Sequence, residues 1–468
     1  MGNATTASVT GVQVAPAKSA IRDLPIAKVW AFAVGQFGWA LLSGIISNWL
    51  VYFYQPDQET ISQGQTVFVP QGLVVLGIVT VVGGITAFAR FFDPAVASLS
   101  DRCDAKSGRR MPFLKFAALP LAVVTVLVFW SPINGTSWVN AAFLFVTVIG
   151  YYIALTFYCT PYNALIAELG HDSKQQLTIS TAISFTWVAG TAIAYVAPVI
   201  WGAFVPMMGR ITAIRVTFTI MAAVAFVCML VPPLAIREKD YVNSQPTSES
   251  TIESLKQTFG DGEFRKFVCS DVVYWVAITT FQTGLPFFVT SLLKLPETTT
   301  TIYFVLMTGV SVLFYLPVNI LANKVGKKRL LLVAFVIFTC AFAFAGALGS
   351  AVLGFIPAMA QGLVLSVVGA IPMAAFGILP QAIVANIADA SSKTTGQDRQ
   401  GMFYAARTFA MKMGQSVAML LFTGVSTIGM ASGAGYRIAA VCAAVLCGLG
   451  GIVFAFYNEK KVLGVLET

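Results

Sequence analysis

Long apolar runs, separated by short polar breaks, extend along the chain from Ile26 to Tyr457. A helix that crosses a membrane needs about 20 mostly apolar residues, because lipid cannot satisfy the hydrogen bonds of an irregular backbone. The runs have this length. Only 10% of the 468 residues are charged and 57% are hydrophobic, whereas soluble domains carry roughly 25% charged residues. The sequence therefore predicts an all-α membrane protein with about twelve transmembrane helices.

The runs form two sets of six. The predicted spans are 26–54, 71–100, 112–131, 138–165, 176–204 and 211–236, followed by 263–292, 301–323, 329–349, 354–388, 400–428 and 434–457. Residues 237–262 between the sets are polar and include Asn243, Gln245 and Pro246, a composition typical of a solvated linker. We expect two six-helix bundles, 26–236 and 263–457, with tails at 1–25 and 458–468.

Basic residues are distributed unevenly over the polar breaks. The breaks on one side hold the clusters at 102–110, 237–239, 265–266, 324–329 and 460–461, whereas the other side holds only Arg210, Arg215, Lys294 and Arg437. Cytoplasmic loops carry an excess of Lys and Arg, so we expect both termini and the linker to be cytoplasmic in a multi-pass plasma-membrane protein, or an inner-membrane protein in a bacterium. No basic face with interleaved aromatics accompanies the net charge of +9, which argues against nucleic acid as a partner.

Two turns at corresponding positions of the two sets are alike. Gly108-Arg109-Arg110 precedes the third predicted span, and Gly326-Lys327-Lys328-Arg329 precedes the ninth. A basic short loop is common in itself, but that does not explain the matched glycine and position. Such internal repeats are typical of transporters whose halves rock about a central site. We therefore predict pseudo-symmetric bundles with a site between them.

Three stretches carry a resemblance to a known family. They are Asp93-Pro94 through Ser100-Asp101-Arg102 to Gly108-Arg109-Arg110-Met111-Pro112; Pro161-Tyr162-Asn163-Ala164-Leu165 with Glu168 and Asp172; and Leu379-Pro380-Gln381-Ala382, Asp389, Thr395 to Phe403 and Lys412-Met413-Gly414. On these residues the chain resembles the major facilitator superfamily, and within it the glycoside-pentoside-hexuronide:cation symporter family that includes the melibiose carriers. The resemblance implies a major facilitator fold and a symporter for a sugar or glycoside-like solute and a cation.

The chain departs from its galactoside-carrying relatives at the positions of their ligands. Where those relatives hold an acidic residue in span one, this chain has Trp39 and Ala40, and where they hold a pair of carboxylates in span two, it has Ala89 with Asp93. An acidic residue of span four and an arginine of span five correspond to Cys159 and Ala182. Most of the sugar and sodium ligands of those relatives are therefore missing from this chain.

Charged residues inside the predicted spans are candidates for cation coupling, because a charge at the bilayer centre costs from about 3 to more than 10 kcal/mol. Arg90 and Asp93 lie three residues apart, on one helical face. They form either a silent buried pair or a coupling carboxylate, Asp93, with Arg90 in the space of a cation, which favours H⁺ over Na⁺ or removes coupling. Lys412 matches the family's Lys-x-Gly motif near the cation site, although a lysine can also snorkel to an interface.

Other polar residues suggest a gate and a solute site. Membrane topology alone would account for the charges proposed as a cytoplasmic gate, but opposite charges on two bundles can also close the inner mouth. The predicted gate residues are Asp101, Arg102, Arg109, Arg110, Asp389 and Arg399. Asp271 fits either an inner gate or a solute contact. The predicted solute-binding residues are Gln36, Trp39, Tyr162, Asn163 and Trp275, although each residue type also commonly serves in helix packing.

Several function classes are disfavoured. No phosphate-binding loop is present, the seven cysteines lack metal-ligand spacing, and the spans hold no convergent nucleophile, base or metal set. We therefore expect no enzyme, no metal and no cofactor beyond co-transported H⁺ or Na⁺, in a protein that works as a monomer in the lipid bilayer. A carrier of an amphipathic solute such as a lysolipid, or of a peptide or cell-wall fragment, remains an alternative; a receptor or embedded enzyme is the alternative from another class.

Overall fold

The computed structural model describes residues 23–70, 96, 99–100, 103, 108–170, 173–242, 258–395, 400–429 and 432–467. Nearly all of the predicted second span, 71–100, lies outside these residues, and so do Arg90 and Asp93. The middle of the predicted linker, residues 243–257, lies outside them too.

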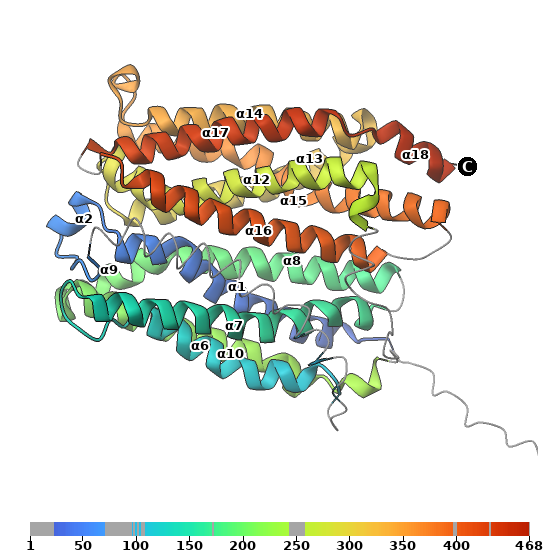
Figure 1. The fold of residues 1–468 in the computed structure, drawn as a ribbon, viewed down its shortest axis with the longest axis horizontal. Coiled ribbons are helices and arrows are strands. Elements are labelled where there is room, and N and C mark those ends of the chain that lie inside the picture. Colours follow the sequence, from blue (N-terminus) through green and yellow to red (C-terminus); the bar gives the residue numbers. More distant parts are fainter. Residues whose placement is uncertain are drawn as a thin grey trace, which may run out of the picture.

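The described helices form two groups that lie side by side (Figure 1). The first group contains α1 (Ile26–Tyr54), α2 (Gln58–Ser62), α6 (Met111–Val128), α7 (Trp138–Leu169), α8 (Ser173–Tyr195), α9 (Ala197–Met208) and α10 (Arg210–Ala235), followed by the short η2 (Glu238–Asp240). The second contains α12 (Gly262–Phe287), the π turn η3 (Phe288–Leu292), α13 (Thr298–Val325), α14 (Lys327–Ala347), η4 (Ala351–Leu353), α15 (Ala358–Thr395), α16 (Gln400–Ser426), α17 (Ala434–Ala455) and α18 (Glu459–Glu467). Figure 1 shows α2 at one end of the molecule and α18 at the other; we call these the α2 end and the α18 end.

Ten helical segments of the described residues are long and apolar enough to cross a membrane. They coincide with ten of the predicted spans. The other two are 71–100, nearly all of which lies outside the described residues, and 400–428. In the latter place α16 is a helix of 27 residues, but it carries Arg407, Lys412 and other polar residues and is not among the ten. The fold is consistent with twelve transmembrane helices in two bundles.

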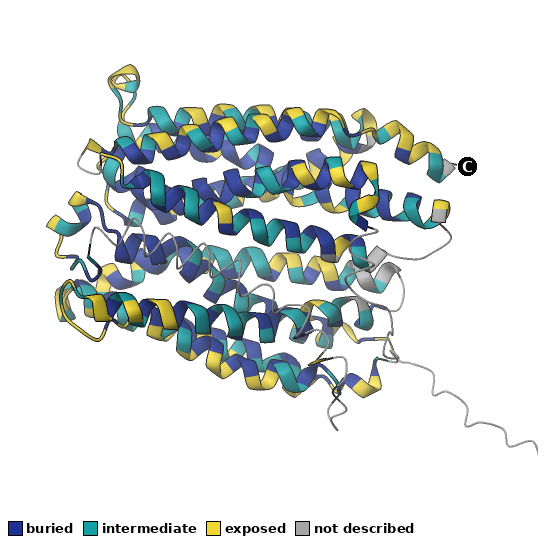
Figure 2. Ribbon diagram, viewed as in Figure 1, coloured by how far each residue is buried: buried dark blue, intermediate teal, exposed yellow. Residues whose placement is uncertain are grey.

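The surface of the helices is apolar where it faces outward. Exposed positions gather on the sides of the helices turned away from the other bundle (Figure 2). The exposed apolar side chains include Phe116 on α6, Leu313 on α13 and Val336 on α14, which are 77%, 74% and 63% exposed. Contiguous exposed apolar surface of this extent marks contact with a membrane, so these side chains face lipid.

The two repeated turns are built alike. Gly108 and Gly326 both adopt positive φ, 123° and 95°. Beside each glycine, a glutamate that follows the last long helix of the same bundle accepts hydrogen bonds from the first backbone N–H groups of the next helix. Glu238 binds the N–H groups of Arg110 and Met111 at 2.8 and 3.0 Å, and Glu459 binds those of Lys327 and Lys328 at 2.9 and 3.1 Å.

A carboxylate at a helix N-terminus satisfies orphan N–H groups and complements the helix dipole. Glu238 follows α10, the last long helix of the first bundle, and Glu459 follows α17, the last long helix of the second. Each glutamate therefore fastens the end of its bundle to the middle of the same bundle. The predicted internal repeat of the two turns therefore includes the glutamates that cap the helices after them, Glu238 and Glu459.

Substitution of Gly326 tests this turn. With φ 95° and ψ 146°, its backbone conformation is nearly exclusive to glycine, so Gly326→Ala is expected to destabilise the fold by about 1–3 kcal/mol. The melting temperature in detergent should fall. The control is Gly309→Ala, since Gly309 lies inside α13 and an added Cβ would meet nothing within 4 Å. Equal melting temperatures for the two variants would contradict this account.

Candidate functional site

At the α2 end, the carboxylate of Glu297 joins the two bundles. Glu297 precedes α13 in the second bundle, yet all four of its donors belong to the first. Its Oε1 accepts from Trp201 Nε1 at 2.5 Å and from Arg210 Nη1 at 3.1 Å. Its Oε2 accepts from Arg210 Nη2 at 2.6 Å and from the hydroxyl of Tyr52 at 3.0 Å. The carboxylate is thus inserted into a polar receptor formed by α1, α9 and the start of α10.

A second carboxylate makes the reciprocal connection. Asp57 precedes α2 in the first bundle, and its Oδ2 accepts from the hydroxyl of Thr290 at 2.7 Å and from that of Ser291, both in η3 of the second bundle. Its Oδ1 caps α2 through the N–H of Thr60 at 2.8 Å. We call Asp57 and Glu297, with these partners, the carboxylate latch. Both residues are buried, so their hydrogen bonds are shielded from competition with water.

Further hydrogen bonds close the interface near the latch. Gln55 donates to the hydroxyl of Ser426 at 3.1 Å. The hydroxyl of Tyr195 donates to the carbonyl of Gln282 at 3.3 Å, and the hydroxyl of Thr301 donates to the carbonyl of Tyr195. Each bond joins the first bundle to the second, so the two bundles are in close contact at this end.

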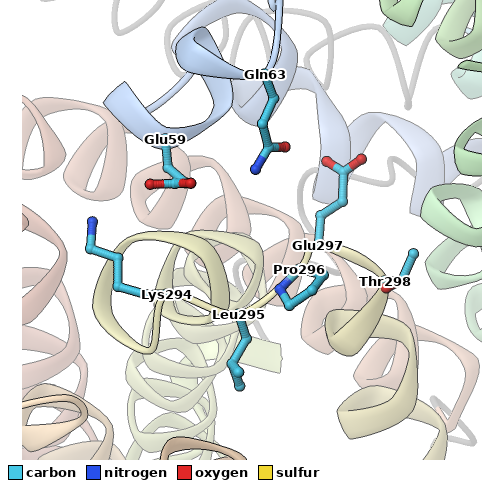
Figure 3. Close-up of a pocket in the computed structure, with 7 residues that line it drawn as sticks. All are labelled: Glu59, Gln63, Lys294, Leu295, Pro296, Glu297 and Thr298. Carbon is cyan, nitrogen blue, oxygen red and sulfur yellow. The ribbon is translucent and has the colours of Figure 1, made fainter.

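A hollow of about 340 Å³ adjoins the latch, lined by Glu59, Gln63, Lys294, Leu295, Pro296, Glu297 and Thr298. Figure 3 shows α2 on one side of it and the segment before α13 on the other. The hollow therefore has walls from both bundles and lies beside the carboxylate of Glu297.

Within the second bundle, Asp271 and Arg407 form a buried ion pair between α12 and α16. Arg407 Nε donates to Oδ2 at 2.9 Å and its Nη2 to Oδ1 at 3.2 Å. The two residues are 4% and 7% exposed. Asp271, which the sequence assigned to a gate or to the solute, thus has a guanidinium partner. Lys412 lies half-buried farther along α16.

The predicted solute-binding residues occupy different environments. Trp39 is half-buried, donates to Gln36 Oε1 at 3.1 Å and packs edge-on against Trp187 at 4.9 Å between ring centroids. In the second bundle, Trp275 is half-buried one helical turn after Asp271, and its indole N–H makes no hydrogen bond among the described residues.

The other two residues of this prediction lie on α7. Tyr162 is fully buried, stacks on Phe32 and donates to the carbonyl of Phe32 at 2.7 Å. In this conformation Tyr162 therefore fastens α7 to α1. Asn163 is exposed, so the structure does not gather the five residues into one described cavity.

The predicted gate residues are described only in part. Arg109 and Arg110 both bind Glu168 Oε1, at 3.3 and 2.7 Å, at the end of α7 in their own bundle. Asp389 is half-buried on α15. Asp101, Arg102 and Arg399 lie outside the described residues, so a contact between the bundles through this set stays a prediction.

Ala40 lies where α1 and α8 approach each other closely. It is fully buried, and a Cβ added to Gly190 of α8 would lie 2.7 Å from the carbonyl oxygen of Phe37 and 3.0 Å from Ala40 Cβ. No acidic side chain fits here without separating the helices.

Sequence reasoning missed the carboxylate latch. Asp57 and Glu297 lie in polar breaks, where acidic residues are ordinary, and Glu297 is 87 residues from Arg210 along the chain. The available signal was that Arg210 is one of only four basic residues assigned to its side of the membrane.

Known proteins similar to this chain are transporters. A family model described as MFS/sugar transport protein matches residues 31–461. The uncharacterized symporter YnaJ of Bacillus subtilis (strain 168) is 23% identical over 38% of this chain and 36% of its own length. The isoprimeverose transporter of Lactiplantibacillus pentosus is 23% identical over 36% of this chain and 33% of its own length. The chain thus spans about a third of the length of each of these two relatives.

A solved structure shares the fold over nearly the whole chain. It is a bacterial homolog of the human lysosomal transporter Spinster, in an inward-facing and unoccupied conformation. The TM-score is 0.64 at 12% identity, with 94% of this chain and 97% of that chain covered.

Separate replacement of Asp271 and Arg407 tests their pairing. Arg407→Leu leaves a buried carboxylate without its partner, which typically costs about 3–5 kcal/mol, so the melting temperature in detergent should fall steeply. The double variant with Asp271→Asn removes both charges and should recover much of the loss. If the fall in melting temperature of the double variant equals the sum of the falls for Arg407→Leu and Asp271→Asn alone, the two residues are not coupled.

Proposed function

The chain belongs to the family of MFS/sugar transport proteins, and from this premise we propose that it carries a sugar or glycoside-like solute across the membrane by alternating access. In this mechanism two bundles rock about a site near the bilayer midplane. The observation that carries the proposal is the hydrogen-bonded closure between the bundles at the α2 end, since a carrier that alternates must close one end while the other opens.

The direction of closure follows from the distribution of basic residues. Arg210, Arg215, Lys294 and Arg437 belong to the sparsely charged side, and Arg210 lies in the latch. The α2 end therefore faces outward and the α18 end faces the cytoplasm. In the proposed orientation, the hydrogen bonds at the α2 end would close the protein to the outside, and the similar Spinster homolog was solved inward-facing.

Two findings support the solute class. The family model is described as a sugar transport protein, and one relative is an isoprimeverose transporter. Within the chain, Trp39 and Gln36 of α1 lie beside Trp187 of α8. Aromatic faces pack against the apolar faces of sugars and an amide can hydrogen-bond their hydroxyls, so this group has suitable chemistry.

The proposed coupling ion is H⁺ rather than Na⁺. Ala40 leaves no carboxylate at the α1 position where galactoside-carrying relatives hold one, and the packing against α8 leaves no room for one. The remaining candidates are Asp93 with Arg90, and Lys412. From their spacing of three residues we expect Arg90 to occupy the space of a metal cation next to Asp93, whereas that carboxylate could still bind a proton.

A counterflow assay in proteoliposomes tests the solute class. We expect exchange of a labelled pentose, hexose or glycoside, and none of a dipeptide or lysolipid. Trp39→Ala should weaken solute binding about 2- to 12-fold, since loss of an aromatic contact costs about 0.5–1.5 kcal/mol. Trp138→Ala is the matched control, because Trp138 is 68% exposed. If only the dipeptide or only the lysolipid is exchanged, the proposed solute class is wrong.

Substitution of Asp93 tests the coupling. Asp93→Asn cannot exchange a proton, so uphill uptake driven by a pH gradient should be lost while solute exchange persists. Asp240→Asn, at an exposed position of η2, should leave both unchanged. Concentrative uptake that survives Asp93→Asn, or that follows a sodium gradient at constant pH, would rule out this coupling.

A further inference from the structure

The donors that hold Glu297 all belong to the bundle opposite to it. We propose that Tyr52, Trp201 and Arg210 form a binding site for a small carboxylate anion, which the protein's own Glu297 occupies while the α2 end is closed. When the bundles separate, Glu297 leaves with the second bundle, and the site becomes available to a carboxylate from solution. This inference rests on the proposed alternation of the two bundles.

The geometry is that of a carboxylate receptor. The guanidinium of Arg210 meets both oxygens through two N–H groups, at 3.1 and 2.6 Å. The indole of Trp201 serves one oxygen and the hydroxyl of Tyr52 the other. A planar guanidinium fork matches the two coplanar oxygens of a carboxylate, as it also matches two oxygens of a phosphate. Here each oxygen receives two donors, one from Arg210 and one from a ring side chain.

The receptor is held in place without Glu297. Gln65 Oε1 accepts from Arg210 Nε at 3.1 Å, and the hydroxyls of Tyr52 and Thr60 are 3.0 Å apart. The ring of Trp201 packs edge-on against that of Trp49 at 5.0 Å. All these supports lie in the first bundle, so separation of the bundles removes the occupant but not the site.

Vacating the site leaves an arginine whose main partner is gone. Arg210 and Glu297 are each 8% exposed in the closed state. A charge that loses its partner in such surroundings is unfavourable until water or another anion replaces that partner. A small carboxylate that binds the vacated receptor therefore stabilises the open state, in proportion to its preference for that state.

The hollow beside the latch provides a path for such an ion. It contains about 340 Å³ and reaches Glu297, and Figure 3 shows the carboxylate of Glu297 at its edge, with Glu59 and Lys294, of opposite charge, on the other side. Because the buried rings of Trp201 and Tyr52 enclose the receptor, it admits an ion of the size of the glutamate terminus, such as acetate.

Chemical rescue tests the site. Glu297→Ala removes the CH₂–COO⁻ group that acetate can replace. We expect a lower melting temperature and faster hydrogen–deuterium exchange of residues 286–298 than in the unchanged protein. Sodium acetate at about 100 mM, enough to saturate a site of millimolar affinity, should restore at least half of the lost melting temperature. Equimolar acetamide, the neutral isostere, with sodium chloride should not.

The guanidinium is tested by a second substitution. In the double variant Glu297→Ala with Arg210→Gln, acetate should have no more effect than acetamide. Rescue that persists without Arg210, or equal rescue by acetamide, would overturn the proposal.

A measurement on the unchanged protein covers the case in which Glu297→Ala does not fold. In the unchanged protein acetate competes with Glu297, so hydrogen–deuterium exchange of residues 286–298 should become faster with acetate and not with acetamide. Equal hydrogen–deuterium exchange in the two solutions would also overturn the proposal. Sugar counterflow by the unchanged protein is read separately. Counterflow without an acetate effect refutes this site alone, whereas an acetate effect without counterflow refutes the proposed solute class alone.

Discussion

The closed state depends on two carboxylates, each held by donors of the opposite bundle. Glu297 is received by the first bundle and Asp57 by the second. Buried charge-assisted hydrogen bonds are strong when every oxygen has a donor and costly when a partner is removed. The contact between the bundles at the α2 end is therefore favourable only when each carboxylate is aligned with its donors on the opposite bundle. Such an interface has discrete closed and open arrangements rather than a continuum, which is what alternating access requires.

In the proposed alternating access, each bundle must keep its own shape while that interface opens and closes. The two repeated turns contribute to this, because Glu238 and Glu459 tie the last part of each bundle to the start of its third helix. The close packing of α1 against α8 around Ala40 contributes in the same way. Neither feature crosses between the bundles, so neither opposes rocking.

Hydropathy and the repeated glycines predicted the architecture because both signals are local. Spans, bundles and the matched turns follow from the residues within one run or one loop. The latch could not be predicted in this way, because Tyr52 and Glu297 are 245 residues apart. The residues next to a glutamate in a polar break do not indicate which distant residue it will bind. The same limit applies to Tyr162, whose motif suggested a solute contact although its hydroxyl binds the backbone of α1. The length of α16 was recognisable, but the pairing of Arg407 with Asp271 was not.

In the proposed transport cycle, two buried ion pairs of similar geometry have different consequences. Asp271 and Arg407 lie on α12 and α16 of one bundle, so they move together and their pairing need not change during a cycle. Glu297 and Arg210 lie on opposite bundles, so their pairing must break each time the α2 end opens. A change in the strength of the first pair alters the stability of one bundle. A change in the second alters the equilibrium between the closed and open states, and the rate at which the carrier leaves the closed state.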